Sequence, residues 1–429
     1  MKKFIILILS LCVCFPVFAA TLNSTLAPTP SPTSTPSKTS SPSAVPTESV
    51  SPTESISPTE SVEPAIEDVI AEVPLFNINA KSYLLMEAET GTVLYKNNEN
   101  EKLPIASVTK IMTALLTAEA IERGELTLDT QIITSENAAS MGGSQVYLEP
   151  NEKMSLRDML KALMVASAND AAVAIAEKIA GTEGAFVGKM NARAKELGMK
   201  NTNFLTSNGL DKEKQDGLST SYDVALMSQE LLKYDYIIKD SQIWMDTLRN
   251  GAFGISNTNK LLKQYEGTIG LKTGSTATAK YCLSAVAKRN DITYIAVVLG
   301  AETPKDRWDG SKQLLDYGFN NYEKYESKID INTKVDKGVK REAEFEIEGG
   351  GACVISKADK SNIRVETDIP KSVSAPIEKG QKVGSVKFYV GEKMLKESNI
   401  IATEDVAKLN IWGGIKYIFE QLFTLEREK

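Results

Sequence analysis

Residues 107–110 read Ser-Val-Thr-Lys, and they begin a stretch of helical periodicity that ends before Gly124. The apolar side chains of this stretch repeat at intervals of three and four residues, as at Val108, Ile111, Met112, Leu115 and Leu116. Because Ser107 and Lys110 are one turn apart on such a helix, their side chains share a face and the amine can reach the hydroxyl. The sequence therefore predicts a buried helix with a serine–lysine pair in its first turn.

The chain of 429 residues contains no histidine, so a Ser-His-Asp relay is excluded and an activated hydroxyl needs another proton acceptor. We expect Lys110 to be that acceptor. Lysine is a base only when neutral, which requires burial and a nearby positive charge to lower its pKa from about 10.4. The free N–H groups of the helix start near Ser107 would stabilise an oxyanion. Taken alone the pair is a weak signal, because an exposed helix lysine also explains it.

The second segment is Ser-Ala-Asn at residues 167–169, between two stretches of helical periodicity. We expect the Asn169 amide to hold Lys110 by a hydrogen bond. We expect Ser167 to bridge Lys110 and Lys272 and to pass a proton to the leaving amine. Taken alone, this segment is typical of a turn between helices, since Ser and Asn favour local capping there.

The third segment is Lys-Thr-Gly at residues 272–274, which the pattern places on an edge strand where an extended substrate can align. Lys272 supplies the second positive charge, and a cation beside the Thr273 hydroxyl suits a terminal carboxylate. Gly274 would let a substrate backbone approach closely. Strand alternation places Lys272 and Thr273 on opposite faces, so the pattern leaves open whether both reach one pocket. The tripeptide alone is typical of a surface turn, but the order and separation of the three segments favour a site.

The surrounding pattern predicts one α+β domain over residues 73–323. Residues 81–97 predict a hairpin with a turn at 87–91. Helical periodicity follows at residues 155–165, 170–179, 185–197 and 221–232, strand patterns at 269–272, 281–287 and 293–299, and a closing helix at 305–322. Strands at both ends with helices between them indicate an antiparallel sheet flanked by helices, in which the ends of the domain meet.

The N-terminal segments predict targeting and a linker rather than a catalytic site. A basic start, an apolar run and the small-residue spacing of Val17-Phe18-Ala19 predict a signal peptide over residues 1–19. A membrane anchor is the alternative, but the run is shorter than the roughly 20 residues that span a bilayer. Residues 20–72 are dominated by Ser, Thr and Pro and offer little apolar surface, so we expect a disordered linker that acts as a tether.

Two further segments follow the large domain. Short alternating runs at residues 342–347, 363–367 and 383–390 predict a small β-rich domain over residues 324–403. In residues 404–429, apolar side chains are spaced at three and four residues, as at Trp412, Ile415, Ile418, Phe419, Leu422 and Phe423. We expect an amphipathic helix that lies in a membrane surface, or alternatively packs on its own domain or on a partner.

Composition excludes several function classes. The net charge of −7 and pI near 5.2, with no basic stripe, argue against nucleic acid as a partner. Outside the predicted signal peptide only Cys282 and Cys353 remain, and neither has a neighbour that would make a metal pair. We expect two buried structural thiols, no metal and no cofactor.

In four segments the chain resembles the penicillin-binding, serine-type D-Ala-D-Ala carboxypeptidases of low molecular mass. These segments are residues 104–114, 167–172 and 270–274, together with Gly-Gly-Ser at 142–144 followed by Tyr-Leu at 147–148. The resemblance covers residues 76–322 strongly and the later segments more loosely. It implies a β-lactamase/transpeptidase-like fold for the large domain.

The resemblance also implies a role for each motif residue. It implies Ser107 as the acylated nucleophile, Lys110 as the base, Ser167 and Asn169 in proton transfer and substrate positioning, and Lys272 and Thr273 as ligands of the terminal carboxylate. The backbone N–H groups of Ser107 and Ser275 would form the oxyanion hole, with Gly274 on the same substrate-binding strand.

Two positions depart from the family pattern. Residues 208–210 read Asn-Gly-Leu where many relatives have His-Gly-Leu, and Ala279-Lys280 stands where many have Ala-Gly. Neither departure changes a residue assigned to catalysis, so we expect any effect to fall on pocket shape or loop mobility.

The implied reaction removes the terminal D-alanine from peptidoglycan stem pentapeptides through an acyl-enzyme, and penicillin would trap that acyl-enzyme. The expected location is outside the cytoplasmic membrane, on its outer face or in the cell wall. One alternative is a class A β-lactamase, but its Glu-x-x-Leu-Asn stretch is absent between Asn169 and Lys272. The other is a catalytically silent peptidoglycan-binding protein, against which the intact motifs argue. The sequence fits either lysine or diaminopimelate as the third stem residue.

Overall fold

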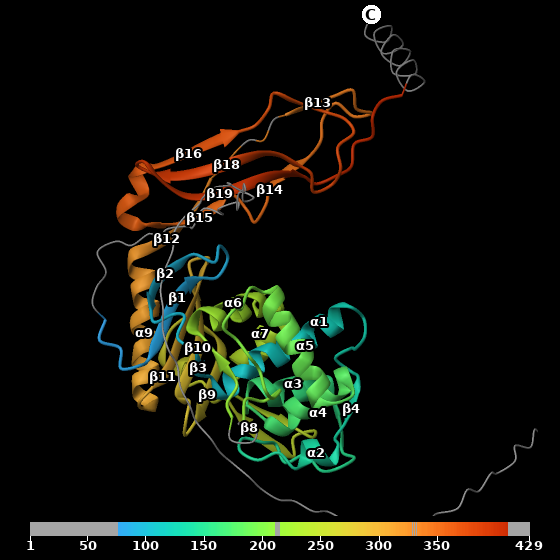
Figure 1. Cartoon of the computed structure of the whole chain (residues 1–429), viewed down its shortest axis with the longest axis vertical. Helices are drawn as coiled ribbons and strands as arrows, with labels where there is room; N and C mark the ends of the chain where they lie inside the picture. Colours follow the sequence, from blue (N-terminus) through green and yellow to red (C-terminus); the bar gives the residue numbers. More distant parts are fainter. Residues whose placement is uncertain (1–75, 211–214, 328, 330, 332, 411–429) are drawn as a thin grey trace, which may run out of the picture. The chain divides into compact units, whose positions relative to one another are not determined.

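The computed structural model describes residues 76–210, 215–327, 329, 331 and 333–410 (Figure 1). The predicted signal peptide, the whole of the predicted linker and residues 411–429 of the predicted terminal helix lie outside these residues. The described chain forms a large α+β domain followed by a small β domain.

A five-stranded antiparallel sheet is the centre of the large domain, with strand order β2-β1-β11-β10-β9. Its strands are β1 (Ser82–Glu87), β2 (Val93–Asn97), β9 (Thr268–Thr276), β10 (Lys280–Arg289) and β11 (Ile292–Ala301). The predicted hairpin is β1 and β2, and β1 pairs with β11, so the two ends of the domain meet as expected. The third motif lies on β9, which is an edge strand, as the pattern indicated.

Helices cover both faces of this sheet (Figure 1). One face packs against α9 (Pro304–Asn321), which begins with a capping box between Thr303 and Asp306. The other face packs against a cluster made of α1 (Lys110–Glu122), α3 (Leu156–Met164), α4 (Asn169–Ala180), α5 (Glu183–Glu196), α6 (Ser221–Leu231) and α7 (Asp235–Gln242). All of these except α7 follow the predicted helical stretches.

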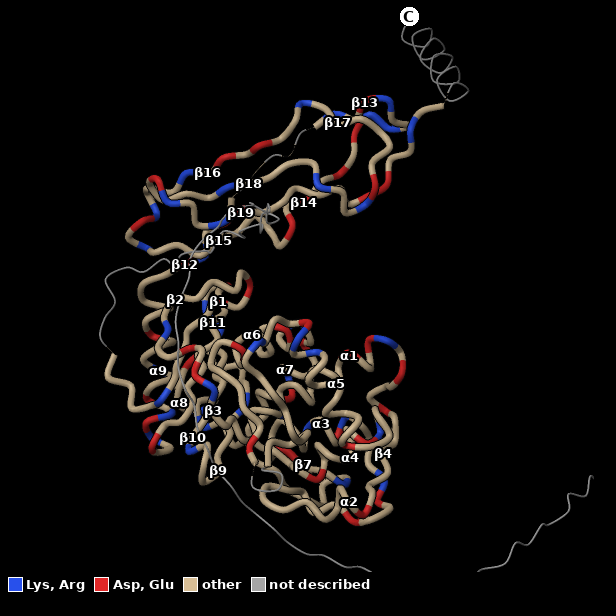
Figure 2. The backbone as a smooth tube through the Cα atoms, viewed as in Figure 1, with Lys and Arg blue, Asp and Glu red and all other residues tan. Residues whose placement is uncertain are grey.

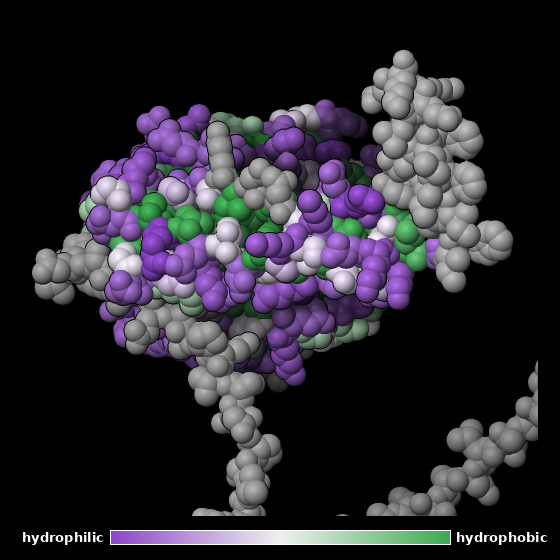
Figure 3. Space-filling view, turned by 90° about the horizontal axis from the view of Figure 1, so that it is seen from above, coloured by the Kyte–Doolittle hydropathy of each residue, from purple (hydrophilic) through white to green (hydrophobic). Residues whose placement is uncertain are grey.

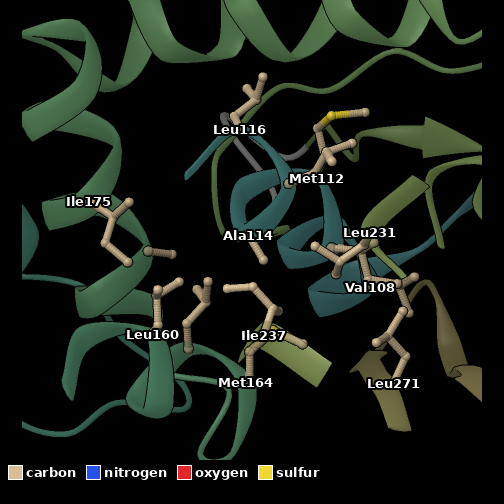
Figure 4. Close-up of a cluster of buried hydrophobic side chains, with 14 of the residues drawn as sticks. Val108, Met112, Ala114, Leu116, Leu160, Met164, Ile175, Leu231, Ile237 and Leu271 are labelled. Atoms are coloured by element: carbon tan, nitrogen blue, oxygen red, sulfur yellow. The ribbon is translucent and has the colours of Figure 1, made fainter. Parts of the chain in front are cut away.

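Strand alternation divides the sheet's side chains between two cores. Leu84 and Met86 of β1 belong to the core on the side of α1, whereas Tyr83 and Leu85 belong to the core on the side of α9. The α1 core brings together side chains from several helices and from β9, among them Val108, Met112, Leu160, Ile237 and Leu271 (Figure 4). The helix that carries Lys110 is therefore surrounded by packed side chains.

The predicted helix from Ser107 is interrupted near its start. Residues Ala106–Thr109 form a 3₁₀ turn, η1, and α1 begins at Lys110. Residues 110–118 are all buried, so this helix is enclosed on every side rather than along one apolar face. A helix that is buried on all sides lies in the centre of its domain. The side chains packed around it hold the backbone of its first turn in one position.

Short elements connect these layers and were not predicted. They are β3 (Leu103–Pro104) paired with β6 (Leu218–Ser219), β4 (Gln131–Ile133) paired with β5 (Lys153–Ser155), α2 (Glu136–Ala139), β7 (Met245–Leu248) paired with β8 (Phe253–Ser256), and α8 (Leu261–Gln264). Strands of two to four residues are too short to leave a periodic signal in the sequence.

The small domain is all-β among the described residues, apart from one 3₁₀ turn, η2 (Lys357–Asn362). Its largest sheet has the order β14-β19-β18-β16, with β14 (Phe345–Ile347), β16 (Ile363–Asp368), β18 (Lys382–Val390) and β19 (Lys393–Ala402). Smaller pairs join β12 (Tyr322–Glu326) to β15 (Ala352–Ser356) and β13 (Lys334–Asp336) to β17 (Ser372–Ser374). The three predicted alternating runs correspond to β14, β16 and β18.

The predicted start of the terminal helix at residue 404 is wrong. Residues 404–410 contain no helix, and Val406 forms a β-bridge with Ile377. Val406 is also buried in a small apolar cluster, so this segment completes the β domain instead of starting a helix.

Charged residues of both signs are interspersed along the described chain (Figure 2). Hydrophilic side chains cover most of the face shown in Figure 3, with smaller apolar areas between them. Within the described part of the chain, no helix has the length and apolar character needed to span a bilayer. Cys282 and Cys353 are free and buried, and burial raises the pKa of each thiol to about 11.

Candidate active site

Ser107 and Lys110 lie together at the start of α1, as their spacing predicts. The Lys110 ammonium Nζ lies 2.9 Å from Ser107 Oγ. Ser107 is partly exposed, whereas Lys110 is fully buried. Ala106, directly before the serine, has a φ of 47°, which is rare for a residue with a side chain. The hydroxyl is therefore reachable from solvent, and the amine beneath it is not.

Lys110 Nζ has two other close partners, and both can only accept a hydrogen bond. Nζ lies 2.6 Å from Asn169 Oδ1, which is the contact predicted for this amide, and 2.7 Å from the carbonyl oxygen of Asn208. A neutral amine has two protons and one lone pair. When Lys110 is neutral, its protons go to these two oxygens and its lone pair is left for the Ser107 hydroxyl proton.

Electrostatics favour that neutral form. Burial lowers the pKa of Lys110 well below the usual lysine value, and the positive charge of Lys272 lowers it further. The Asp170 carboxylate acts in the opposite direction but is the smallest of the three causes. Among the described residues, no carboxylate lies within salt-bridge distance of Lys110. A buried lysine without such a partner is expected to lose its proton.

Two further buried cations lie along β9. Burial, together with the charge of Arg307, lowers the pKa of Lys272 to about 7. Arg307 comes from α9, and its Nη1 donates to the carbonyl oxygens of Gly274 at 3.3 Å and Cys282 at 3.2 Å. The sequence analysis missed this arginine, because it lies more than thirty residues after the third motif and resembles any other helix arginine. The strand beside Ser107 is thus electropositive, which suits an anionic ligand.

Asn169 connects Lys110 to a loop at residues 142–148. Its Nδ2 donates to the carbonyl oxygen of Gly142 at 2.7 Å, and its backbone N–H donates to the carbonyl oxygen of Ser144 at 2.7 Å. The next residue, Asp170, accepts hydrogen bonds from the backbone N–H groups of Val146 and Leu148. One helix start therefore fixes both the amine of Lys110 and the loop next to it.

Ser167 lies in the turn between α3 and α4, with a φ of 61° and only 3% of its surface exposed. The predicted bridge from its hydroxyl to the two lysines is absent among the described residues. Lys110 is fully engaged by Ser107, Asn169 and Asn208, and Lys272 Nζ donates to the carbonyl oxygen of Thr273 at 3.1 Å instead. The positive φ at a non-glycine residue marks a position held by its surroundings, which is common at functional sites.

The third motif lies directly beside the nucleophile. A Cβ atom on Gly274 would lie 2.5 Å from the carbonyl oxygen of Ile105 and 3.1 Å from the backbone nitrogen of Ser107. Gly274 is thus needed for β9 to approach η1, in addition to any approach by substrate. Thr273 is buried, and its Oγ1 lies 2.7 Å from Thr258 Oγ1. Ser275, the first residue after the motif, is exposed. The edge of β9 therefore adjoins the Ser107 N–H.

The Asn208 carbonyl was not predicted to take part in the site. The local signal was the Asn-Gly dipeptide, which favours a turn with a positive φ. Gly209 has a φ of 82°, and a Cβ there would lie 1.9 Å from the carbonyl oxygen of Ala106. Only glycine fits this position without a clash. The turn that it allows places the Asn208 carbonyl oxygen within hydrogen-bond distance of Lys110 Nζ.

Residues 67–303 match the family described as D-alanyl-D-alanine carboxypeptidase, and residues 322–408 match the C-terminal domain of penicillin-binding protein 5. The chain belongs to the D-alanyl-D-alanine carboxypeptidase family. It is 44% identical over 337 residues to the D-alanyl-D-alanine carboxypeptidase DacF of Bacillus subtilis, with 77% of this chain and 86% of the relative covered. It is 32% identical to DacC of Escherichia coli, with 79% and 87% covered.

Solved structures agree with this membership. Penicillin-binding protein 5 of Haemophilus influenzae matches with a TM-score of 0.68 at 30% identity, over 78% of this chain and all of that one. Penicillin-binding protein D2 of Listeria monocytogenes, solved in an ampicillin-bound form, matches with a TM-score of 0.53 at 32% identity, over 57% of this chain and all of that one. The protein is a serine-type D-Ala-D-Ala carboxypeptidase with a penicillin-binding protein 5-like fold.

The turn at Gly209 gives a test of this geometry. Gly209→Ala adds a Cβ at a strained φ and against a backbone oxygen, so the Asn208 carbonyl must move away from Lys110. We expect D-alanine release to fall at least tenfold and the free energy of unfolding to drop by about 1–3 kcal/mol. Gly251→Ala is the matched control, because Gly251 also has a positive φ but nothing lies within 4 Å of its added Cβ. Equal activity losses in the two variants would contradict the role of the turn.

Proposed function

We propose that Ser107 is the nucleophile of this carboxypeptidase and that neutral Lys110 is its general base. The observation that carries the proposal is the set of contacts around Lys110 Nζ. Two oxygens that can only accept take the protons of the amine, so its lone pair is directed at Ser107 Oγ. As the hydroxyl oxygen bonds to the substrate carbonyl carbon, the hydroxyl proton passes to Nζ.

The substrate in this proposal is a peptide ending in D-Ala-D-Ala, as found in peptidoglycan stem pentapeptides. Its terminal carboxylate binds at Lys272 and Thr273, where Arg307 adds positive charge behind the strand. The backbone extends along the edge of β9, and the backbone N–H groups of Ser107 and Ser275 stabilise the oxyanion. The position of Gly274 against η1 supports this, because it brings β9 beside the Ser107 N–H.

Collapse of the tetrahedral intermediate breaks the peptide bond, and the leaving D-alanine nitrogen takes a proton. Ser167 passes that proton from Lys110 to the leaving group in our proposal, and Asn169 positions Lys110 and the substrate. Water then attacks the ester on Ser107, and the second product leaves with a new carboxylate. Penicillin offers a strained amide to the same serine, and we propose that it forms a stable ester there.

The surroundings of the enzyme are also part of the proposal. A signal peptide at residues 1–19 and a Ser/Thr/Pro-rich tether at 20–72 support export to the outer face of the membrane or to the cell wall. The apolar spacing after residue 411 supports contact of the terminal segment with a membrane surface. Peptidoglycan lies in that compartment, so enzyme and substrate would meet there.

The nucleophile can be tested with a fluorescent penicillin. Wild-type protein should become covalently labelled, and Ser107→Ala should lose all labelling, because no other hydroxyl occupies that position. Lys110→Ala should remain folded and lose at least a hundredfold in acylation rate, since general-base catalysis typically contributes that much. Ser140→Ala, in an exposed turn after α2, is the control. Normal labelling of Ser107→Ala would remove this serine from the mechanism.

The pH dependence of acylation tests the electrostatic coupling of the lysines. The base form of Lys110 exists above its pKa, so acylation should be lost as the pH falls through that value. Lys272→Met removes a neighbouring positive charge, which should raise the pKa of Lys110 and move the acidic limb of the acylation profile to higher pH.

Lys272→Arg is the matched control for that profile, because it keeps the charge and should leave the limb in place even if the rate falls. Penicillin acylation rates between pH 4 and pH 10 would be compared after normalising each variant to its own maximum. Superimposable limbs for wild type and Lys272→Met would contradict the coupling.

A further inference from the structure

The peptide between Asn208 and Gly209 carries the carbonyl that contacts Lys110, and its N–H is bound as well. Gly209 N–H donates to Thr206 Oγ1 at 3.0 Å, and Asn208 O accepts from Lys110 Nζ at 2.7 Å. The N–H and C=O of a trans peptide lie in one plane and point in opposite directions. A hydrogen bond at the N–H therefore also sets the direction of the carbonyl.

The Thr206 hydroxyl both accepts and donates within this turn. Its Oγ1 accepts from Gly209 N–H, and its proton is donated to the carbonyl oxygen of Leu210 at 3.0 Å. The Asn208 side chain adds another bond, because its Oδ1 accepts from Leu210 N–H at 2.8 Å. Side-chain hydrogen bonds thus hold residues 206–210 together, and they come from residues outside the three motifs.

Without such bonds, a second orientation is open to the peptide. Turns of types I and II differ mainly by a half-rotation of their central peptide, and type II requires a positive φ at the residue after it. Gly209 has that positive φ, 82°. An Asn-Gly pair is compatible with either form. The residue types at 208 and 209 alone therefore do not keep the carbonyl directed at Lys110.

Ser207, the residue before this peptide, anchors the turn to α5 and α1. Its backbone N–H and its hydroxyl both donate to Glu183 Oε1, at 2.9 Å and 2.7 Å. Its carbonyl oxygen accepts from Thr113 Oγ1 at 2.5 Å. Thr113 lies one turn after Lys110 on α1, so these two side chains bind successive carbonyls of the turn. The start of the turn is therefore fixed, and the orientation of the next peptide remains to be set.

We propose that Thr206 is a positioning residue of the reaction, which selects the peptide orientation that presents the Asn208 carbonyl to Lys110. This inference rests on the proposed function, in which the neutral amine of Lys110 is the base. With the carbonyl turned away, one proton of the amine would lose its acceptor. The lone pair would then no longer be fixed on Ser107 Oγ. Thr206 exerts this effect through the backbone of the turn.

Two substitutions separate the Thr206 hydroxyl from the shape of the side chain. Thr206→Val keeps the shape but can neither accept from Gly209 N–H nor donate to the Leu210 carbonyl, whereas Thr206→Ser keeps the hydroxyl. We expect the maximal rate of penicillin acylation to fall about tenfold in Thr206→Val, which is the effect of one lost hydrogen bond at the base. In Thr206→Ser it should stay within about twofold of wild type.

The pH profile of acylation distinguishes this role from a general loss of stability. A carbonyl oxygen accepts a stronger hydrogen bond from an ammonium group than from a neutral amine, so its loss disfavours the charged form. The pKa of Lys110 should therefore fall, and the acidic limb of the Thr206→Val profile should move to lower pH. Lys272 and Asp170, the charged groups that act on Lys110, are unchanged in this variant. A variant that only unfolds more easily would lose amplitude and keep its limb in place.

Thr247→Val is the matched control, because Thr247 is exposed on β7, and it should keep both the wild-type rate and the wild-type limb. The positioning role is overturned if Thr206→Val is acylated at the wild-type rate, or if its acidic limb stays in place or moves to higher pH. Equal losses in Thr206→Val and Thr206→Ser would also overturn it. If wild-type protein is not acylated at all, the proposed function fails instead.

Discussion

The structure depends on a lysine that is buried without a counter-charge. Lys110 is fully buried, and its close partners are two carbonyl-type oxygens and the hydroxyl of Ser107. Burying an unpaired charge costs several kcal/mol, and such groups neutralise when they can. Lys272 and Arg307 reinforce this tendency, because their charges lower the pKa of the next lysine in turn. We propose that a chain without histidine obtains its base for neutral pH in this way, from burial and like-charge repulsion.

The fold brings segments that are distant in the sequence together around the Lys110 amine. The start of α1 provides Ser107 and Lys110, the start of α4 provides Asn169, and a turn fixed by Gly209 provides the Asn208 carbonyl. The packed core around α1 holds these segments in register. The same helix start that positions Asn169 also fixes the loop at residues 142–148 through hydrogen bonds of Asn169 and Asp170.

Much of this could be predicted from sequence where periodicity or motif spacing is strong. The central helices, the three long strands at 268–301 and the Ser107–Lys110–Asn169 contacts follow from local pattern and from the order of the motifs. What could not be predicted depends on tertiary contacts. Lys110 donates to the backbone carbonyl of Asn208 and Arg307 to that of Gly274, and contacts with backbone oxygens cannot be predicted from residue type. The predicted hydrogen bonds from the Ser167 hydroxyl to the two lysines are absent among the described residues, where Lys272 donates to the carbonyl oxygen of Thr273. At residues 404–410 the β-bridge between Val406 and Ile377 stands where the helix was predicted to begin, and such a tertiary pairing cannot be predicted from local spacing.

The protonation state of Lys110 is the central claim, and nitrogen NMR measures it directly. Protein with ¹⁵N-labelled lysine side chains would be titrated, with the Lys110 Nζ signal assigned by its loss in Lys110→Met. Our account predicts that this signal titrates far below the other lysines and reports a neutral amine at neutral pH. A Lys110 signal that titrates with the exposed lysines, near the ordinary pKa of about 10.4, would contradict it.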